Sequence, residues 1–163
     1  MVKSHGRAFV LFTSYTSMKQ TAEKMADFFE ERGWRLLVQG AGMQRNQLLT
    51  EFKKDIHSVL FGTDSFWTGV DVPGESLSNV IITKLPFAMP DHPVTASRIE
   101  HIEQQGGNSF MEYSVPEAIL KLRQGIGRLI RSKKDKGFCV ILDNRVLTKQ
   151  YGRSFLAALP ECP

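Results

Sequence analysis

The chain has 163 residues, 21 lysines and arginines against 17 aspartates and glutamates, and a formal net charge of +4. A hydrophobic content of 42% is enough for a folded core and excludes intrinsic disorder. The two cysteines are too few for a disulfide framework or an iron–sulfur cluster, and no apolar run is long enough to cross a membrane. We therefore expect a single soluble domain over residues 1–163, cytoplasmic or otherwise intracellular, with no metal site and no membrane partner.

The first half of the chain alternates short apolar runs with amphipathic stretches. The run AFVLFT predicts a buried strand, and the apolar spacing of three and four after it predicts a helix that begins with a Ser17/Gln20 capping box and ends before Gly33. In chain order we predict a strand at 8–13, a helix at 17–32, a strand at 35–38, a helix at 44–53 and a strand at 58–61.

The second half continues the alternation after a glycine-rich segment at 62–74. Three prolines hold the segment that follows the next strand in an extended loop. A Ser114/Glu117 pair has capping-box spacing and predicts the start of a long helix. In chain order we predict a strand at 79–85, a helix at 94–105, a helix from 114 to about 130, a strand at 138–142 and a terminal amphipathic helix.

This order of elements predicts an α/β fold, an open and mainly parallel sheet with helices on both faces. In such sheets the loops at the carboxyl ends of the strands share one crevice, where backbone amides and helix N-termini point. The functional residues should therefore lie in the loops at 13–16, 62–74 and 143–145.

The helix from residue 114 separates into two faces at about 100° per residue. Gln124, Arg128 and Arg131 share one stripe, opposite the apolar side chains. Two guanidinium groups one turn apart suit a polyphosphate, since each offers a two-pronged set of donors. Gly125 and Gly127 flank the stripe and indicate that something approaches the backbone closely. The alternative is a solvated face with two tolerated glycines.

The segment GTDSFWTGVDVPG at 62–74 has the composition of a loop shaped around a ligand. The pair Phe66-Trp67 fits either base stacking or, more readily, the core. Asp71 fits either a paired buried acid or a turn before Pro-Gly. Hydroxyl groups that can donate to phosphates are those of Thr63, Ser65 and Thr68.

Taken together, the motifs resemble the C-terminal lobe of the DinG/XPD type of superfamily 2 helicases. The resemblance runs over residues 6–159, and its most specific part is the QxxGRxxR pattern. The segments that carry it are LFTSYTSM at 11–18 (motif IV), FGTDSFWTGVDVPGE at 61–75 (motif V), KLPFAMPDHPV at 84–94 and QGIGRLIRS at 124–132 (motif VI).

The resemblance implies a RecA-like second motor lobe of an ATP-dependent 5′–3′ DNA helicase. Arg131 would be the arginine finger and Arg128 its companion at the γ-phosphate, with Gln124 completing motif VI. Gly69 and Asp71 would link nucleotide and DNA. The contacts to single-stranded DNA phosphates would come from Thr13, Ser14, Tyr15, Thr63 and Ser65.

The chain contains no GxxxxGK[ST] loop and no DExH-type acid box. ATP and Mg²⁺ would therefore be bound mainly by an N-terminal P-loop lobe of the same protein, and the chain alone should not hydrolyse ATP. The family's iron–sulfur cysteines would also belong to that other half. We therefore expect the chain to be a fragment of a larger helicase or, alternatively, to work beside a separate partner.

Two other classes of protein remain open at this stage. The chain could be a stand-alone RecA-like module that binds nucleic acid or a nucleotide without catalysis. A small phosphate-binding enzyme of flavodoxin-like topology is less favoured, because no general base or nucleophile accompanies the arginines.

Overall fold

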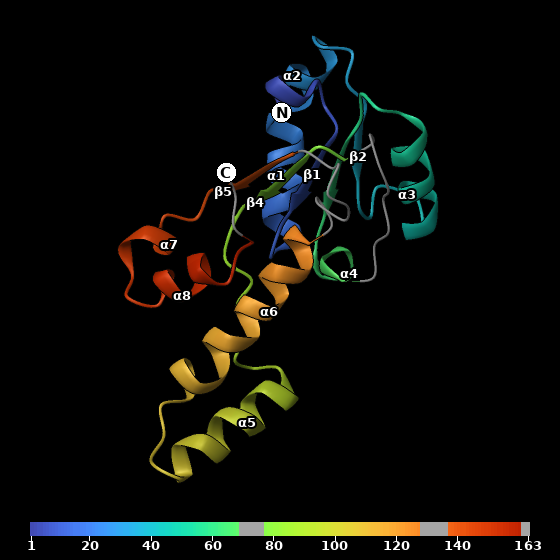
Figure 1. Cartoon of the computed structure of the whole chain (residues 1–163). Helices are drawn as coiled ribbons and strands as arrows, with labels where there is room; N and C mark the ends of the chain where they lie inside the picture. The colour runs from blue at the N-terminus through green and yellow to red at the C-terminus, as the bar shows by residue number, and fades with distance from the viewer. Residues whose placement is uncertain (69–76, 128–136, 161–163) are drawn as a thin grey trace. The chain divides into compact units, whose positions relative to one another are not determined.

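A computed structural model describes residues 1–68, 77–127 and 137–160, except for the side chain of Asp64. The chain forms two compact units (Figure 1). The first comprises Met1–Lys84 and Gln124–Leu142, and the second comprises Leu85–Arg123 and Asp143–Pro163. The chain thus leaves the first unit after β4 and returns to it through the last turn of a helix.

The first unit is built on a parallel sheet of five strands in the order β2-β3-β1-β4-β5. The predicted fold class is confirmed, and all five predicted strands form. Register pairs Leu11 of β1 with Gly62 of β3 and with Ile82 of β4, so these three strands end level with one another. The strands are β1 (Ala8–Leu11), β2 (Leu36–Val38), β3 (Val59–Gly62), β4 (Asn79–Ile82) and β5 (Phe138–Ile141).

Alternate side chains of the buried strands pack against helices on opposite faces of the sheet. Val10 and Phe61 join a core cluster with Met18 of α1 (Tyr15–Lys24) and Phe29 of α2 (Ala26–Glu30). On the other face, the Phe9 ring lies 6.4 Å from that of Phe52 in α3 (Arg45–Lys54). The inner strands β1, β3 and β4 are therefore buried on both faces, as their continuous apolar runs require, whereas the edge strand β5 is largely exposed.

The helix predicted at 17–32 begins earlier and is interrupted. Ser14, not Ser17, is the N-cap, and its side-chain oxygen accepts from the backbone N–H of Ser17 at 3.4 Å. The Ser17/Gln20 capping box is therefore wrong, because β1 ends at Leu11 and leaves Ser14 free to begin the helix. Met25 separates α1 from α2 with a non-helical backbone, and Gly33 follows with φ +61°, as expected of a glycine after a helix.

A short helix, α4 (Asp64–Trp67), stands at the start of the segment predicted to be a loop. Both aromatic side chains of this helix are fully buried. Phe66 lies against Phe9 with 6.0 Å between ring centroids. The hydrophobic burial of Phe66 and Trp67 thus organises the segment as a helical turn, which confirms the core interpretation of this pair.

The second unit begins with α5 (Pro93–Gln104), which has a proline at its start, followed by the π-helical turn η3 (Phe110–Ser114) and α6 (Val115–Ile126). The Ser114/Glu117 capping box is wrong, because the chain is already helical before Ser114. Asn108 begins this segment instead. Its side chain accepts from Met111 N–H at 3.1 Å, and Glu112 accepts from the Asn108 N–H at 2.7 Å.

The second unit ends with two short helices, α7 (Arg145–Thr148) and α8 (Gly152–Ala157). Phe87 from the proline-rich loop stacks on Phe110 at 5.5 Å and meets Tyr151 and Phe155 edge-on. This aromatic cluster joins three segments that are distant in sequence.

Within the described part of the chain, no helix is long and apolar enough to span a membrane. Nor do the described residues bring together three histidine, cysteine, aspartate or glutamate side chains in a way that would hold a metal ion.

Candidate functional site

The segments that follow β1, β2 and β3 meet at the carboxyl end of the sheet. Phe12 N–H donates to Gly62 O at 2.8 Å, which brings the motif IV loop beside the start of motif V. Tyr15, 45% exposed, lies against Gly40 after β2, where an added Cβ would be 3.0 Å from its ring. The structure therefore places the described residues predicted from motifs IV and V along one edge, as parallel register requires; they are Thr13, Ser14, Tyr15, Thr63 and Ser65.

Gln39 joins two of the predicted DNA-contact residues. It lies just after β2, and its side-chain oxygen accepts from the Thr63 N–H at 2.7 Å and from the Thr63 hydroxyl at 3.0 Å. Its amide nitrogen donates to the Ser65 hydroxyl oxygen at 3.1 Å. Sequence reasoning missed Gln39 because it considered the loops after three strands but not the one after β2. The signal was a polar residue directly following a predicted strand.

Arg45 of α3 holds the backbone of the same segment. Its guanidinium group donates to Ser65 O at 3.2 Å and to Thr68 O at 3.1 Å, and it lies 5.5 Å from the centre of the Phe66 ring. Sequence analysis did not single out Arg45. The contacts fix α4 from the solvent side, while Phe66 anchors it from the core side.

Exposure separates the predicted DNA-contact residues into two groups. Ser14, Tyr15 and Ser65 are exposed and Thr13 is half-buried, so these side chains face or border solvent at the carboxyl edge. The Thr63 side chain is buried, with 4% exposure, and its hydroxyl proton is directed to Gln39. Thr63 therefore supports the segment from inside.

Gly125 of motif VI packs against the core of the first unit. A Cβ on Gly125 would lie 3.0 Å from the Trp67 ring and 3.1 Å from the Leu11 side chain. The Trp67 indole N–H in turn donates to Phe12 O at 3.0 Å. A close approach to this glycine was expected, and the groups that approach it are the Trp67 ring of motif V and the Leu11 side chain of motif IV. Motifs IV, V and VI thus meet around one tryptophan.

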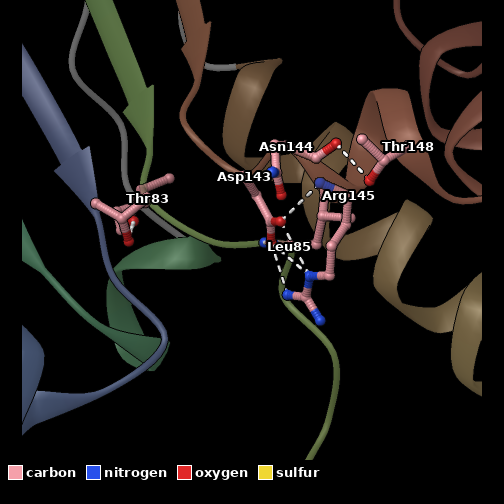
Figure 2. Close-up of polar contacts among 7 residues, drawn as sticks. Thr83, Leu85, Asp143, Asn144, Arg145 and Thr148 are labelled. Atoms are coloured by element: carbon pink, nitrogen blue, oxygen red, sulfur yellow. Dashed lines mark hydrogen bonds and ion pairs between the residues drawn. The ribbon is translucent and has the colours of Figure 1, made fainter.

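The loop after β4 contributes Thr83, whose hydroxyl donates to Leu11 O at 2.9 Å (Figure 2). The Thr83 backbone N–H donates to the same oxygen at 3.1 Å and continues the pairing of β4 with β1 beyond the last strand residue. The Thr83 hydroxyl therefore adds a second hydrogen bond at the carboxyl end of the sheet.

Asp143 forms a compact ion pair with Arg145 in the second unit (Figure 2). One carboxylate oxygen accepts from the Arg145 guanidinium at 2.6 Å and from Leu85 N–H at 2.9 Å. The hydrogen bonds from Arg145 lower the pKa of Asp143 from 3.8 to about 2. The carboxylate is thus ionised and engaged with its own chain, so the predicted loop at 143–145 holds a structural ion pair.

Four of the predicted site residues lie outside the described part of the chain, namely Gly69, Asp71, Arg128 and Arg131. Gln124, the remaining motif VI residue, is exposed in the last turn of α6. The opposite face of α6 carries Leu122 and Ile126 in the core, as the helical phasing predicts.

A family model described as the helicase C-terminal domain matches residues 1–162. The chain belongs to this family. The ATP-dependent DNA helicase YoaA of Haemophilus influenzae is 48% identical over 95% of this helicase C-terminal domain and 24% of its own length. The 3′-5′ exonuclease DinG of Bacillus subtilis is 46% identical over 93% of the domain and 16% of its own length.

A solved structure of an XPD helicase matches the helicase C-terminal domain with a TM-score of 0.69 at 20% identity, covering 96% of this chain and 28% of that one. This similarity shows a shared fold, and the resemblance to a DinG/XPD-type C-terminal lobe is confirmed. The chain spans about a quarter or less of the length of the two curated relatives.

Proposed function

We propose that the helicase C-terminal domain is the second motor lobe of an ATP-dependent 5′–3′ DNA helicase. In this role it binds single-stranded DNA at the carboxyl edge of its sheet and supplies arginines to a nucleotide site shared with an N-terminal P-loop lobe. The observation that carries the proposal is the meeting of motifs IV and V at that edge, through the Phe12–Gly62 hydrogen bond and the Tyr15–Gly40 contact.

The exposed side chains at this edge suit a DNA backbone. Ser14, Tyr15 and Ser65 carry neutral hydroxyls, which can donate to phosphate oxygens whatever the base. Contacts of this kind let a motor move along a strand without reading its sequence. The buried state of Phe66 and Trp67 supports the same conclusion, because fully buried rings cannot stack on bases.

The nucleotide part of the proposal rests on the sequence motifs. Arg131 serves as the arginine finger and Arg128 as its companion, with Gln124, Gly69 and Asp71 beside the nucleotide. ATP supplies the free energy for movement, and Mg²⁺ belongs mainly to the P-loop lobe. Any iron–sulfur cluster of the complete helicase also belongs to the other half. Trp67, which touches both Gly125 of motif VI and Phe12 of motif IV, is a direct physical link between the nucleotide side and the DNA side.

The first test uses the purified chain. It should bind a labelled oligothymidylate but show no ATP turnover above background, and mixing it with the matching P-loop lobe should restore DNA-stimulated turnover. Steady magnesium-dependent hydrolysis by the chain alone would contradict the shared-site model. Nucleotide binding without any DNA binding would favour a stand-alone nucleotide module instead.

A second test addresses Arg131 in the complete helicase. An arginine finger stabilises charge that develops in the transition state and is worth about 10³ to 10⁵ in rate. Arg131→Ala should therefore abolish turnover while ATP affinity stays within about tenfold. If the variant keeps more than about a tenth of the turnover, Arg131 is not the finger.

A further inference from the structure

We propose that Gln39 is a positioning residue that turns the Ser65 hydroxyl outward, so that its proton is available to a DNA phosphate. The inference rests on the proposed single-stranded DNA site and assigns the direction of hydrogen bonding within it. Three residues from two neighbouring strand ends, Gln39, Thr63 and Ser65, form one hydrogen-bond chain at that site.

The orientation of the Gln39 amide follows from its partners. A backbone N–H can only donate, so the Gln39 atom 2.7 Å from Thr63 N must be the carbonyl oxygen. The Thr63 hydroxyl, 3.0 Å from the same oxygen, must donate as well. The amide NH₂ group is then fixed on the opposite side, where it faces Ser65 Oγ at 3.1 Å.

This orientation sets the direction of the Ser65 hydroxyl. Because its oxygen accepts a hydrogen bond from Gln39, its own proton must point elsewhere. Ser65 is exposed, and within the described residues its side chain has no second hydrogen-bond partner. The proton is therefore available to an acceptor in solution, such as a phosphate oxygen.

Thr63 has the opposite arrangement. Its hydroxyl proton is directed inward to Gln39 and its side chain is only 4% exposed. Of the two motif V hydroxyls, Ser65 is thus the donor to DNA, and Thr63 helps to hold Gln39 in place.

The donor is also held before any ligand arrives. The Gln39 N–H donates to Phe61 O at 3.0 Å and extends the β2–β3 pairing, which fixes the backbone from which the amide projects. The Arg45 guanidinium donates to the Ser65 carbonyl oxygen at 3.2 Å and so fixes the Ser65 backbone. Because the backbones of both Gln39 and Ser65 are fixed, the Ser65 hydroxyl needs little further ordering when DNA binds.

Gln39→Glu tests the direction of the bond. A glutamate keeps an acceptor for both Thr63 donors, which should preserve the fold, but it replaces the NH₂ group by a second acceptor oxygen. The Ser65 proton then turns inward to the carboxylate. Since glutamate also adds a negative charge near the DNA, the variant is made in two backgrounds, the unmodified chain and Ser65→Ala, so that the charge effect can be subtracted.

Affinity for a fluorescein-labelled oligothymidylate is measured by anisotropy for the full chain, together with thermal unfolding. Ser65→Ala should weaken binding about three- to tenfold. Gln39→Glu should weaken it about tenfold in the unmodified chain but only about two- to threefold in Ser65→Ala, with unfolding temperatures close together. Gln104→Glu, the same charge change on an exposed glutamine of α5, should leave the affinity unchanged.

Equal losses from Gln39→Glu in both backgrounds would overturn the inference and leave the DNA site intact. The same holds if Ser65→Ala binds as well as the unmodified chain. Gln39→Leu adds a further check, since a purely structural role predicts lower stability with unchanged affinity. Failure of the unmodified chain to bind the oligonucleotide would overturn the proposed DNA site and, with it, the role of Gln39.

Discussion

Replacing Asp143 by asparagine should destabilise the second unit. The substitution replaces one accepting carboxylate oxygen by an NH₂ group, which would then face other hydrogen-bond donors. The carboxylate receives hydrogen bonds from Leu85 N–H and from the Arg145 guanidinium and N–H, and Asp143 is only 8% exposed. An asparagine presents one oxygen and one NH₂ group to these same donors. At least one of them therefore loses its partner.

The pKa of Asp143 gives the magnitude. It falls from 3.8 to about 2 in the folded protein, and one pKa unit corresponds to about 1.4 kcal/mol, so the ionised carboxylate contributes about 2 kcal/mol. Because the folded pKa is the lower one, this contribution is complete above pH 3.8 and is lost as the pH falls toward 2. At neutral pH, Asp143→Asn should lower the urea midpoint by about 1 M for a slope of about 2 kcal/mol per M.

Urea unfolding followed by far-ultraviolet circular dichroism, at several values from pH 7 to pH 2.5, tests this reasoning. The difference between the two proteins should be constant near neutrality and should shrink toward the acid end. Amide hydrogen exchange at Leu85 should also be faster in the variant. Asp91→Asn, at an exposed position of the loop before α5, serves as the control and should change little. If the difference in unfolding stability between the two proteins stays constant down to pH 2.5, the ion pair of Asp143 does not account for that difference.

Two substitutions test the packing that connects the helicase motifs. Gly125→Ala should destabilise the domain by about 1 kcal/mol despite alanine's better helix propensity, because the new Cβ would lie 3.0 Å from the Trp67 ring, which is held by its hydrogen bond to Phe12 O. Urea unfolding measures the difference. A stability equal to or above that of the unmodified chain would show that the Trp67 ring can move aside. Gly62→Ala would place a Cβ 2.6 Å from Phe66 Cβ and should displace α4. It should lower both stability and oligothymidylate affinity, and unchanged affinity would mean that DNA binding does not depend on the position of α4, which carries Ser65.

The sheet was predictable because its strands are short apolar runs bounded by turn residues. For β1, β3 and β4, burial on both faces also leaves little choice of secondary structure. The helix starts were less predictable. The sequence TSYTS offers several hydroxyls that can cap a helix, and only the end of β1 at Leu11 decides that Ser14 does so. Likewise, Ser114/Glu117 has ideal capping spacing, but Asn108 and Glu112 begin the helical segment earlier. Local patterns identify candidate caps, whereas tertiary packing selects among them.

The candidate site was likewise only partly predictable. A single segment identifies the two hydroxyl residues, but their hydrogen bonding depends on a second segment. Thr63 and Ser65 were found from motif V, yet their different roles depend on Gln39, which is 24 residues from Thr63 and 26 from Ser65. Nothing within motif V distinguishes two hydroxyls spaced two residues apart. The distinction arises because β2 and β3 are neighbours in a parallel sheet and end at the same edge, which brings a single amide between them. The Gln39 side-chain amide has one accepting and one donating end. Because the Thr63 backbone N–H occupies the accepting end, the donating end faces Ser65 and sets the direction of its hydrogen bond. Sheet order, rather than the motif, therefore decides which hydroxyl is directed outward, toward the proposed DNA site.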